Sequence, residues 1–511
     1  MNKPWKIHPI AWWPVLLLAT AKLLVHVFTS GGYGYFRDEL YFLDCARHLQ
    51  WGYVDDAPGI AIYAKLALLL GGSLPAVRLL PALAGAGTVV LTSLLAREMG
   101  GGRFGQGFAG LCLLAAPIFL GMDSILCVGA FEPLFWMGCA LLTIRIARTG
   151  EARLWLWFGL WAGVGLLNKY TMGLVLVCFC TALVLSPLRR EFRRPMLWCG
   201  GGLALLIFLP ALIWQIRNHF PLLEDMENIR RQGKNVVLGP FAFLGQQIEF
   251  LDPLLAPLWL GGLVWLFLQR GLRVLAWFYV LMLGAMIALH GKNYYLAAIY
   301  PMLFAAGAVA LEEGLARWAW TRERLWAQVS LSALVAATFL VFVPLLLPCL
   351  PPERLLAYQT ALGLKVQKLE VGHESRLDQR LSDQFGWPEI AQEVARIYHA
   401  LPPEERARTA IYAGNYGEAG AINQFGPALG LPRAVCAHNA HSFWGPPAVE
   451  PTAIICLGCD RSGLESACQS VIPVGEHQHP WGMAEENRPI FLVRGLRTPL
   501  RELWPRLKHW N

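Results

Sequence analysis

Long apolar segments separated by short polar ones fill the chain from residue 10 to about residue 350. A membrane-spanning helix needs about 20 predominantly apolar residues. Eleven segments approach that length and composition, at residues 10–29, 75–96, 105–122, 125–147, 154–168, 170–187, 197–214, 253–269, 274–289, 294–311 and 328–349. A further apolar run, residues 59–71, is shorter and is expected to be interfacial or re-entrant. The pattern predicts a polytopic α-helical membrane protein with about eleven transmembrane helices.

The remaining residues, 351–511, have the composition of a water-soluble domain. The whole chain is only 15% charged, whereas soluble domains are about a quarter charged, and the deficit lies in the apolar part. We therefore expect a multi-pass membrane domain over residues 1–350, with a first outer loop at 30–74, and a C-terminal domain over 351–511. Segments typical of an α/β fold follow there, with buried strands at 410–413, 453–456 and 490–493 and a helix at 388–400.

Basic residues indicate which side of the membrane each loop faces, because Lys and Arg favour cytoplasmic loops. Alternate loops carry Lys3 and Lys6; Arg97 and Arg103; Arg145, Arg148 and Arg153; Arg189, Arg190, Arg193 and Arg194; Arg270 and Arg273; and Arg317, Arg322 and Arg324. The N-terminus is then cytoplasmic, and the C-terminal domain faces outward from the plasma (inner) membrane. These loops account for the net charge of +8, which therefore gives no evidence for nucleic acid binding. A cleaved signal peptide is the alternative for the first segment, but its apolar run is long and no small-residue cleavage site follows.

Cysteines and a glycine-rich segment in the C-terminal part each allow two interpretations. Cys456 and Cys459 have CxxC spacing, but without a second pair this is a weak metal or redox signal, and Cys456 falls in a predicted buried strand. The two cysteines are interpreted as small buried residues, with a disulfide as the alternative. The segment from Gly414 to Gly420 follows a strand like a phosphate-binding loop, but it lacks the strict glycine spacing. A structural turn is the favoured interpretation.

The first outer loop has the most unusual composition. Between Tyr33 and Pro58 it holds the acidic pairs Asp38-Glu39 and Asp55-Asp56, with aromatic residues between them. A helix beginning at Asp38 would explain the first pair, since acidic residues favour the first turn of a helix. The loop also suits a reaction at a membrane surface, where a carboxylate acts as general base and a cation or metal meets a leaving phosphate. The two interpretations are compatible.

Other ionisable residues of the membrane part gather on the predicted outer side, among them Lys169 and Lys292. Glu132 lies about two turns inside a predicted span. An ionisable group at that depth is costly and indicates function, unless neighbouring helices satisfy it. Tyr294 and Tyr295 follow Lys292 and would sit at the membrane interface, where tyrosine is common.

Several motifs together resemble a known family. The stretch Arg37 to Phe42 and the stretch Gly52 to Pro58 resemble the first outer loop of the family 39-type glycosyltransferases of the GT-C fold, which include protein O-mannosyltransferase-like and bacterial aminoarabinose-transferase-like enzymes. Other stretches similar to this family are Phe131 to Trp136, Leu166 to Tyr170 and Lys292 to Pro301. The C-terminal stretches Gln384 to Trp387, Gly414 to Gly420 and Trp444 to Pro446 resemble a bacterial subset of it. Their order and their shared side make the set specific, although each motif alone is weak.

The resemblance implies an inverting hexosyl- or pentosyltransferase that uses a polyprenyl-phosphate sugar donor. Asp38 would be the general base for the acceptor or would orient it, and Glu39 would support it or help to hold a metal. Asp55 and Asp56 occupy positions where relatives bind metal or phosphate. Tyr294 and Tyr295 would line the donor pocket, with interface anchoring as the alternative.

One departure from the family pattern concerns donor binding. Some relatives carry a lysine before two prolines, whereas this chain has Asp56 followed by Ala57. Since an aspartate repels phosphate, the resemblance implies either a divalent metal of unspecified identity or a cation from Lys169 or Lys292. The expected acceptor is a lipid, a glycan or a protein of the cell envelope. A lipid-linked sugar transporter or flippase is an alternative function, and a non-catalytic envelope assembly factor is another.

Overall fold

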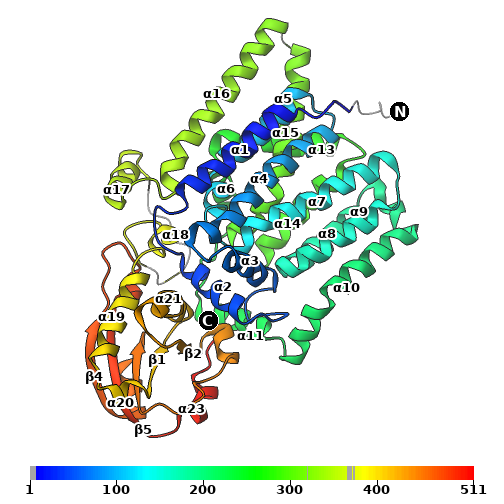
Figure 1. The fold of residues 1–511 in the computed structure, drawn as a ribbon. Coiled ribbons are helices and arrows are strands. Elements are labelled where there is room, and N and C mark those ends of the chain that lie inside the picture. The colour runs from blue at the N-terminus through cyan, green and yellow to red at the C-terminus, as the bar shows by residue number, and fades with distance from the viewer. Residues whose placement is uncertain (1–6, 319, 365–370, 372–373, 511) are drawn as a thin grey trace. The chain divides into compact units, whose positions relative to one another are not determined.

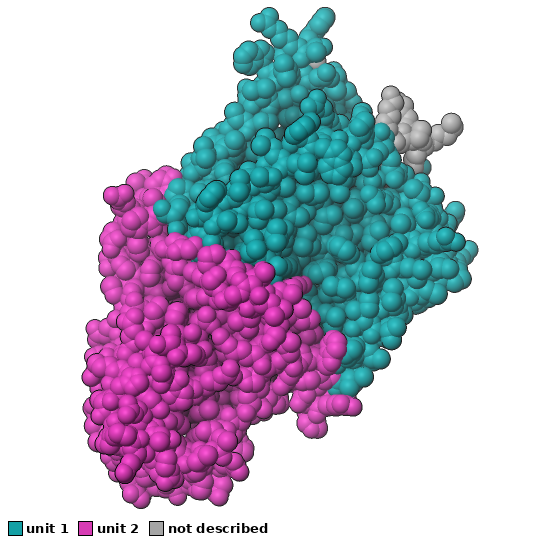
Figure 2. Space-filling view, in the orientation of Figure 1, with its two compact units in different colours: residues 1–30, 78–213, 237–349 teal, residues 31–77, 214–236, 350–511 magenta. Residues whose placement is uncertain are grey.

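The computed structural model describes residues 7–318, 320–364, 371 and 374–510, and within them the chain forms two compact units. Unit 1 comprises Met1–Ser30, Arg78–Ile213 and Val237–Cys349, and unit 2 comprises Gly31–Val77, Trp214–Val236 and Leu350–Asn511 (Figure 2). Most of the first outer loop and the segment Trp214–Val236 thus group with the C-terminal residues. Lys3 and Lys6, counted above among the basic residues of cytoplasmic loops, lie outside the described residues.

Unit 1 is built from helices (Figure 1). They are α1 (Trp12–Thr29), α4 (Leu74–Glu98), α5 (Arg103–Ala115), α6 (Pro117–Met122), α7 (Val128–Thr149), α8 (Leu154–Asn168), α9 (Thr171–Val184), α10 (Pro195–Arg217), α12 (Pro240–Phe250), α13 (Ala256–Leu268), α14 (Arg273–Ala288), α15 (Tyr300–Trp318) and α16 (Thr321–Leu346), with the 3₁₀ helices η1 (Pro187–Arg193), η2 (Pro253–Leu255) and η3 (Asn293–Ile299). Helices α4 and α10 begin or end in unit 2.

Each of the eleven apolar segments forms helix, so the predicted helical membrane architecture is confirmed. Within the described residues, six helices are long and apolar enough to cross a membrane, or up to eight if each of two bent pairs is one span. The bent pairs are α9 with η1 and α12 with η2 and α13. Three further apolar helices are shorter: α3 (Gly59–Leu69), α8 and α14. The protein is therefore a multi-pass membrane protein.

Small residues let helices of unit 1 approach closely. Gly262 of α13 faces Gly307 of α15, and a Cβ on Gly262 would lie only 2.6 Å from the backbone nitrogen of Gly307. Without a hydrophobic driving force in lipid, such close backbone packing is a main source of helix association.

Unit 2 contains a mixed five-stranded sheet in the order β2-β1-β3-β5-β4. Its strands are β1 (Thr409–Ala413), β2 (Ala434–Cys436), β3 (Ala453–Leu457), β4 (Cys468–Glu476) and β5 (Pro489–Leu496). Strand β1 is parallel to β2 and β3, and β5 is antiparallel to β3 and β4. The predicted strands correspond to β1, β3 and β5. Strand β4 has no alternating pattern and contains Pro473, which is tolerated because β4 is an edge strand.

The other elements of unit 2 are helices, of which α19 and α21 pack against the sheet (Figure 1). They are α2 (Arg37–Arg47), α3, α11 (Pro221–Gln232), α17 (Pro352–Ala361), α18 (Gln379–Ser382), α19 (Trp387–Ala400), α20 (Pro403–Arg406), α21 (Tyr416–Phe425), α22 (Arg461–Ala467) and α23 (Leu500–Leu507), with the 3₁₀ helices η4 (Gly426–Leu429), η5 (Asn439–Phe443) and η6 (Ala484–Glu486). Helix α19 is the one predicted at 388–400, and it begins at Trp387 with proline next, the usual place for proline in a helix.

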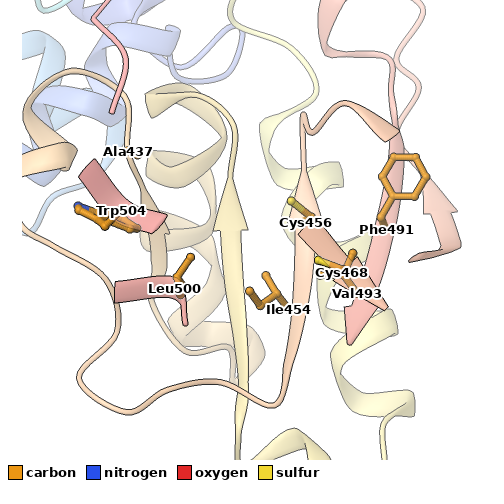
Figure 3. Close-up of a cluster of buried hydrophobic side chains, with 8 residues drawn as sticks. All are labelled: Ala437, Ile454, Cys456, Cys468, Phe491, Val493, Leu500 and Trp504. Atoms are coloured by element: carbon orange, nitrogen blue, oxygen red, sulfur yellow. The ribbon is translucent and has the colours of Figure 1, made fainter. Parts of the chain in front are cut away.

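A buried cluster joins β3, β5 and α23 within unit 2. Figure 3 shows its eight side chains, which are Ala437, Ile454, Cys456, Cys468, Phe491, Val493, Leu500 and Trp504. Cys456 is buried there, but it is bonded to Cys459, with the two Cα atoms 6.0 Å apart. The interpretation of these cysteines as unpaired small residues is therefore corrected to a disulfide, because Cys459 follows the strand end closely enough to turn back onto Cys456.

Candidate functional site

Helix α2 places the first acidic pair. It begins after Phe36, whose backbone N–H donates to the Glu39 carboxylate at 2.8 Å, so Glu39 closes the start of the helix and is fully buried. Asp38, the preceding residue, keeps 35% of its side chain exposed. The helix interpretation of the pair is thus confirmed, and the catalytic role of Asp38, whose side chain is partly exposed, stays a prediction. The predicted catalytic role of Glu39 stays a prediction.

Asp38 is held by a residue far along the chain. The hydroxyl of Tyr416, the first residue of α21, donates to Asp38 Oδ1 at 3.0 Å. The Arg37 Nε lies 3.9 Å from the same oxygen, and its guanidinium lies 5.6 Å from the centre of the Tyr416 ring. A donor and a cation therefore fix the carboxylate while leaving part of it open, as a general base requires.

Asp55 lies in the same unit, and both of its carboxylate oxygens accept hydrogen bonds. Tyr41 donates to Oδ1 at 2.8 Å, and the Asn439 amide donates to Oδ2 at 2.9 Å. Burial raises the pKa of Asp55, and the charge of Asp38 raises it further, while the two donors favour the ionised form. The neighbouring Asp56 closes a tight turn through its backbone carbonyl, which accepts the Tyr53 N–H at 3.1 Å.

Asp44 is a buried acid of α2 that the sequence interpretation missed. Its carboxylate accepts from Asn423 at 2.7 Å and from Arg47 at 2.8 Å, and Nε2 of His441 lies 3.1 Å from it. Although burial acts against ionisation, His441, Asn423 and Arg47 together hold the pKa of Asp44 below its ordinary value. Its one signal in the sequence is a charge within a run of residues that α2 buries.

The residues predicted in unit 1 form a second group. Lys169, between α8 and α9, lies 3.0 Å from the Glu132 carboxylate of α7, which also accepts from Thr171 at 2.6 Å. The Lys169 ammonium also lies 3.9 Å from the centre of the Tyr295 ring. Glu132 is buried and satisfied by these partners. The charge of Glu132 is thus balanced by Lys169. Any donor phosphate that binds Lys169 would have to compete with Glu132 for its ammonium group.

The segment after α14 is fixed by α12. The side chain of Asn293 donates to Gln246, and its backbone carbonyl accepts from the Gln247 amide at 2.8 Å. This anchoring begins η3, whose first tyrosine, Tyr294, packs edge-to-face against Tyr295 with ring centres 5.0 Å apart. Lys292 immediately precedes the helix as its N-cap.

The predicted site residues therefore divide between the units. Unit 2 holds the carboxylates Asp38, Glu39, Asp55 and Asp56, and unit 1 holds Glu132, Lys169, Lys292, Tyr294 and Tyr295. Within the ranges that the structure describes, no group of three His, Cys, Asp or Glu side chains could enclose a metal. A Mg²⁺ ion bound by one or two carboxylates and a substrate phosphate would not need such a group. The metal at Asp55 and Asp56 stays a prediction.

The glycine-rich segment after β1 is a structural turn. The Glu418 carboxylate accepts the backbone N–H groups of Gly414 at 2.9 Å and of Asn415 at 3.2 Å. The donors that would cradle a phosphate are thus occupied by the chain itself, which agrees with the favoured interpretation. Burial and the nearby Glu486 raise the pKa of Glu418 to about 8.

Comparisons with known proteins relate part of the chain to a family. The family model of dolichyl-phosphate-mannose-protein mannosyltransferase matches residues 55–214. No curated protein matches the chain by sequence.

Two solved structures share the fold over nearly the whole chain. ArnT from Cupriavidus metallidurans bound to undecaprenyl phosphate is 17% identical, covers 94% of this chain and 97% of its own, and superposes with a TM-score of 0.59. The apo state of the same protein is 15% identical, with the same coverage and a TM-score of 0.56. These matches confirm the resemblance seen in the sequence: residues 55–214 match the mannosyltransferase family model, and the chain has the fold of ArnT.

Proposed function

We propose that the chain is a membrane glycosyltransferase that moves a sugar from a polyprenyl-phosphate-linked donor to an envelope acceptor on the outer side of the inner membrane. The observation that carries this proposal is Asp38, an accessible carboxylate held by Tyr416 and Arg37. The undecaprenyl phosphate bound to ArnT, a structure of the same fold, supports the donor class.

We expect the reaction to take place in one displacement, with Asp38 as its base. Asp38 takes the proton of an acceptor hydroxyl as its oxygen attacks the anomeric carbon of the sugar, and the bond from that carbon to the phosphate oxygen breaks. The sugar is joined to the acceptor oxygen with inverted configuration at the anomeric carbon. The polyprenyl phosphate departs with the bonding electrons. A cation must meet the phosphate charge, and Lys169 and Lys292 are the candidates of unit 1.

The test uses the full-length protein in lipid nanodiscs. Undecaprenyl-phosphate-linked hexoses and pentoses are supplied one at a time, with an envelope extract as the acceptor source, and release of undecaprenyl phosphate is followed by mass spectrometry. We expect Asp38→Asn to abolish release while the protein stays folded. The matched control is Asp460→Asn, an exposed acid that caps α22, which should retain wild-type release.

Full release by Asp38→Asn would overturn the assignment of the base. Passage of an intact donor across liposomes without any covalent product would favour the transporter alternative instead.

A further inference from the structure

The segment that joins α9 to α10 runs across the direction of α9. A bend of 108° separates α9 from η1, and α10 begins two residues after η1 ends. Helix α10 is a candidate membrane span, and only 17% of its most apolar window is buried inside the protein, so most of its surface is left to contact lipid. A short polar segment that turns sharply between two such apolar helices lies along the membrane surface rather than through it.

Apolar side chains border this segment on both sides. The exposed ones are Val184 and Leu185 before it and Met196 and Trp198 after it. The Trp198 indole N–H donates to the carbonyl of Phe192 at 2.9 Å, while 62% of the residue remains exposed. A tryptophan with a satisfied N–H and an exposed ring is typical of the membrane interface. The boundary between apolar and polar surface therefore falls at η1.

The one acidic residue of the segment faces inward. Pro187–Arg194 contains four arginines and a single glutamate, Glu191. The buried Glu191 carboxylate accepts from the Trp155 indole at 3.0 Å. Arg194 lies 3.4 Å from the same oxygen and donates to the Gly150 carbonyl at 2.6 Å. Glu191 thus attaches the segment to the start of α8 and balances the charge of one arginine.

The other three arginines of the segment point away from this attachment. Arg189, Arg190 and Arg193 are exposed. Among the residues that the structure describes, none of the three has an acidic side chain within ion-pair distance. Three positive charges are therefore presented together by a segment that Glu191 holds in place.

A second group of arginines in unit 1 shows the contrast. Arg97, Arg145 and Arg148 surround the buried carboxylate of Glu98, with nitrogen-to-oxygen distances of 3.0, 3.1 and 2.9 Å. These arginines join the end of α4 to the end of α7, so their charges serve the packing of unit 1. No comparable carboxylate occupies Arg189, Arg190 or Arg193 in the part of the chain that is described.

We propose that Arg189, Arg190 and Arg193 form a binding surface for the anionic headgroups of membrane phospholipids. A guanidinium binds a phosphate through two parallel hydrogen bonds, so the charge and the geometry of these side chains are complementary to such a headgroup. The sequence predicts the segment on the cytoplasmic side, where anionic lipids give the leaflet a negative surface potential. This inference is independent of the proposed function, because it uses none of the residues assigned to donor or acceptor.

Lipid binding is measured on the full-length protein in detergent. Phosphatidylglycerol is the anionic probe and phosphatidylethanolamine the zwitterionic one, and native mass spectrometry counts the bound lipids during a titration with each. We expect the wild type to bind phosphatidylglycerol more tightly. Replacing all three arginines (Arg189→Gln, Arg190→Gln and Arg193→Gln) should weaken phosphatidylglycerol binding by about 10- to 100-fold and leave phosphatidylethanolamine binding unchanged.

The matched control removes the same charge from unit 2. Arg408, Arg433 and Arg506 are exposed there, and their replacement by glutamine should leave the affinity for phosphatidylglycerol unchanged. Lysine at positions 189, 190 and 193 keeps the charge and should keep most of the preference. If the triple glutamine variant does not fold, the single variant Arg190→Gln provides the test, with an expected loss of about fivefold.

Three results would overturn the proposal. The first is an unchanged affinity for phosphatidylglycerol in the folded glutamine variants. The second is equal binding of the two phospholipids by the wild type. The third is tighter binding of undecaprenyl phosphate than of phosphatidylglycerol, lost in the same variants, which would reassign these arginines to the polyprenyl-phosphate donor.

Discussion

The hydroxyl of Tyr416 donates a 3.0 Å hydrogen bond to the carboxylate of Asp38, a residue 378 positions earlier in the chain. The bond joins the first turn of α21, which follows β1, to the first turn of α2 in the first outer loop. Close packing makes it possible, since Gly420 of α21 lies against Leu40 so tightly that a Cβ there would come within 2.7 Å of the Leu40 Cβ. Within unit 2, a helix of the C-terminal α/β part thus supplies a donor to the predicted general base.

Tyr416→Phe should slow transfer without unfolding the protein. The substitution removes the donor to Asp38 but keeps the ring, which lies 4.8 Å from Tyr41 and 4.9 Å from His438 by ring centres. A hydrogen bond to a charged group contributes about 1.5–3 kcal/mol, so we expect kcat to fall about 10- to 100-fold. Release of undecaprenyl phosphate measures the rate, and Tyr398→Phe in α19 is the control. A wild-type rate in Tyr416→Phe would show that the bond does not serve Asp38 in the reaction.

Glu132 and Lys169 should depend on each other for the stability of the protein. Their effects on activity should be separable. Removing one partner of a buried ion pair costs about 3–5 kcal/mol, because the other charge stays buried and unpaired. We therefore expect Glu132→Gln and Lys169→Met each to lower the melting temperature of the detergent-solubilised protein. The double variant should recover part of that loss.

Activity then distinguishes a structural pair from a phosphate-binding one. If Lys169 also meets the donor phosphate, the double variant regains stability but not the release of undecaprenyl phosphate. Recovery of both stability and release would show that the pair has only a structural role. Lys292 would then be the one predicted lysine left to bind the donor phosphate.

Local elements of this fold could be predicted from the sequence, because each rests on a local pattern. Apolar runs of helical length mark the helices of unit 1, and short apolar runs bounded by turns mark β1 and β3. The start of α2 next to Asp38 follows from the preference of acidic residues for the first helical turn.

Contacts between distant residues could not be predicted in this way. The contact of Asn439 with Asp55 carries no signal in the sequence, since the two residues lie 384 positions apart. Asp44 looks like an ordinary helix charge until His441 and Asn423 come beside it. Such partners are set by tertiary packing, which no periodicity in one sequence records.

Glu418 should make the stability of unit 2 depend on pH. Its pKa in the folded protein is about 8, above the ordinary 4.5, because it is buried beside Glu486. Between these values the folded state holds a proton that the unfolded state releases, so stability is fully present below about pH 4.5 and falls as pH rises through about 8. Glu418→Gln removes this ionisation, and its carbonyl can still accept the N–H groups of Gly414 and Asn415.

Melting temperatures across pH 5 to about 9 test this prediction. The wild type should lose stability over that range, and Glu418→Gln should lose distinctly less. The exposed Glu404→Gln in α20 is the matched control and should follow the wild type. Identical slopes in Glu418→Gln and wild type would show that Glu418 is ionised in the folded protein at neutral pH.

A buried ion pair in unit 1 depends on a glycine beside it. Lys22 of α1 lies 2.8 Å from Asp123, which follows α6, and also donates to the carbonyl of Phe119 at 2.9 Å. Gly85 of α4 makes room for the pair, since a Cβ there would lie 2.6 Å from the Asp123 Cγ and 2.9 Å from the Lys22 Cε. Both charged side chains are almost fully buried, so neither can swing into solvent to relieve the clash.

Gly85→Ala should therefore lower the melting temperature, although glycine-to-alanine changes inside helices usually stabilise by about 0.5–1 kcal/mol. Overpacking a buried site costs about 1–3 kcal/mol, and displacing an ion pair from its partners adds to this. Gly201→Ala in α10 is the matched control, because no atom lies within 4 Å of the added Cβ. A Gly85→Ala protein as stable as Gly201→Ala would mean that Lys22 and Asp123 can separate at no cost, so that the pair contributes nothing to the packing of α1 against its neighbours.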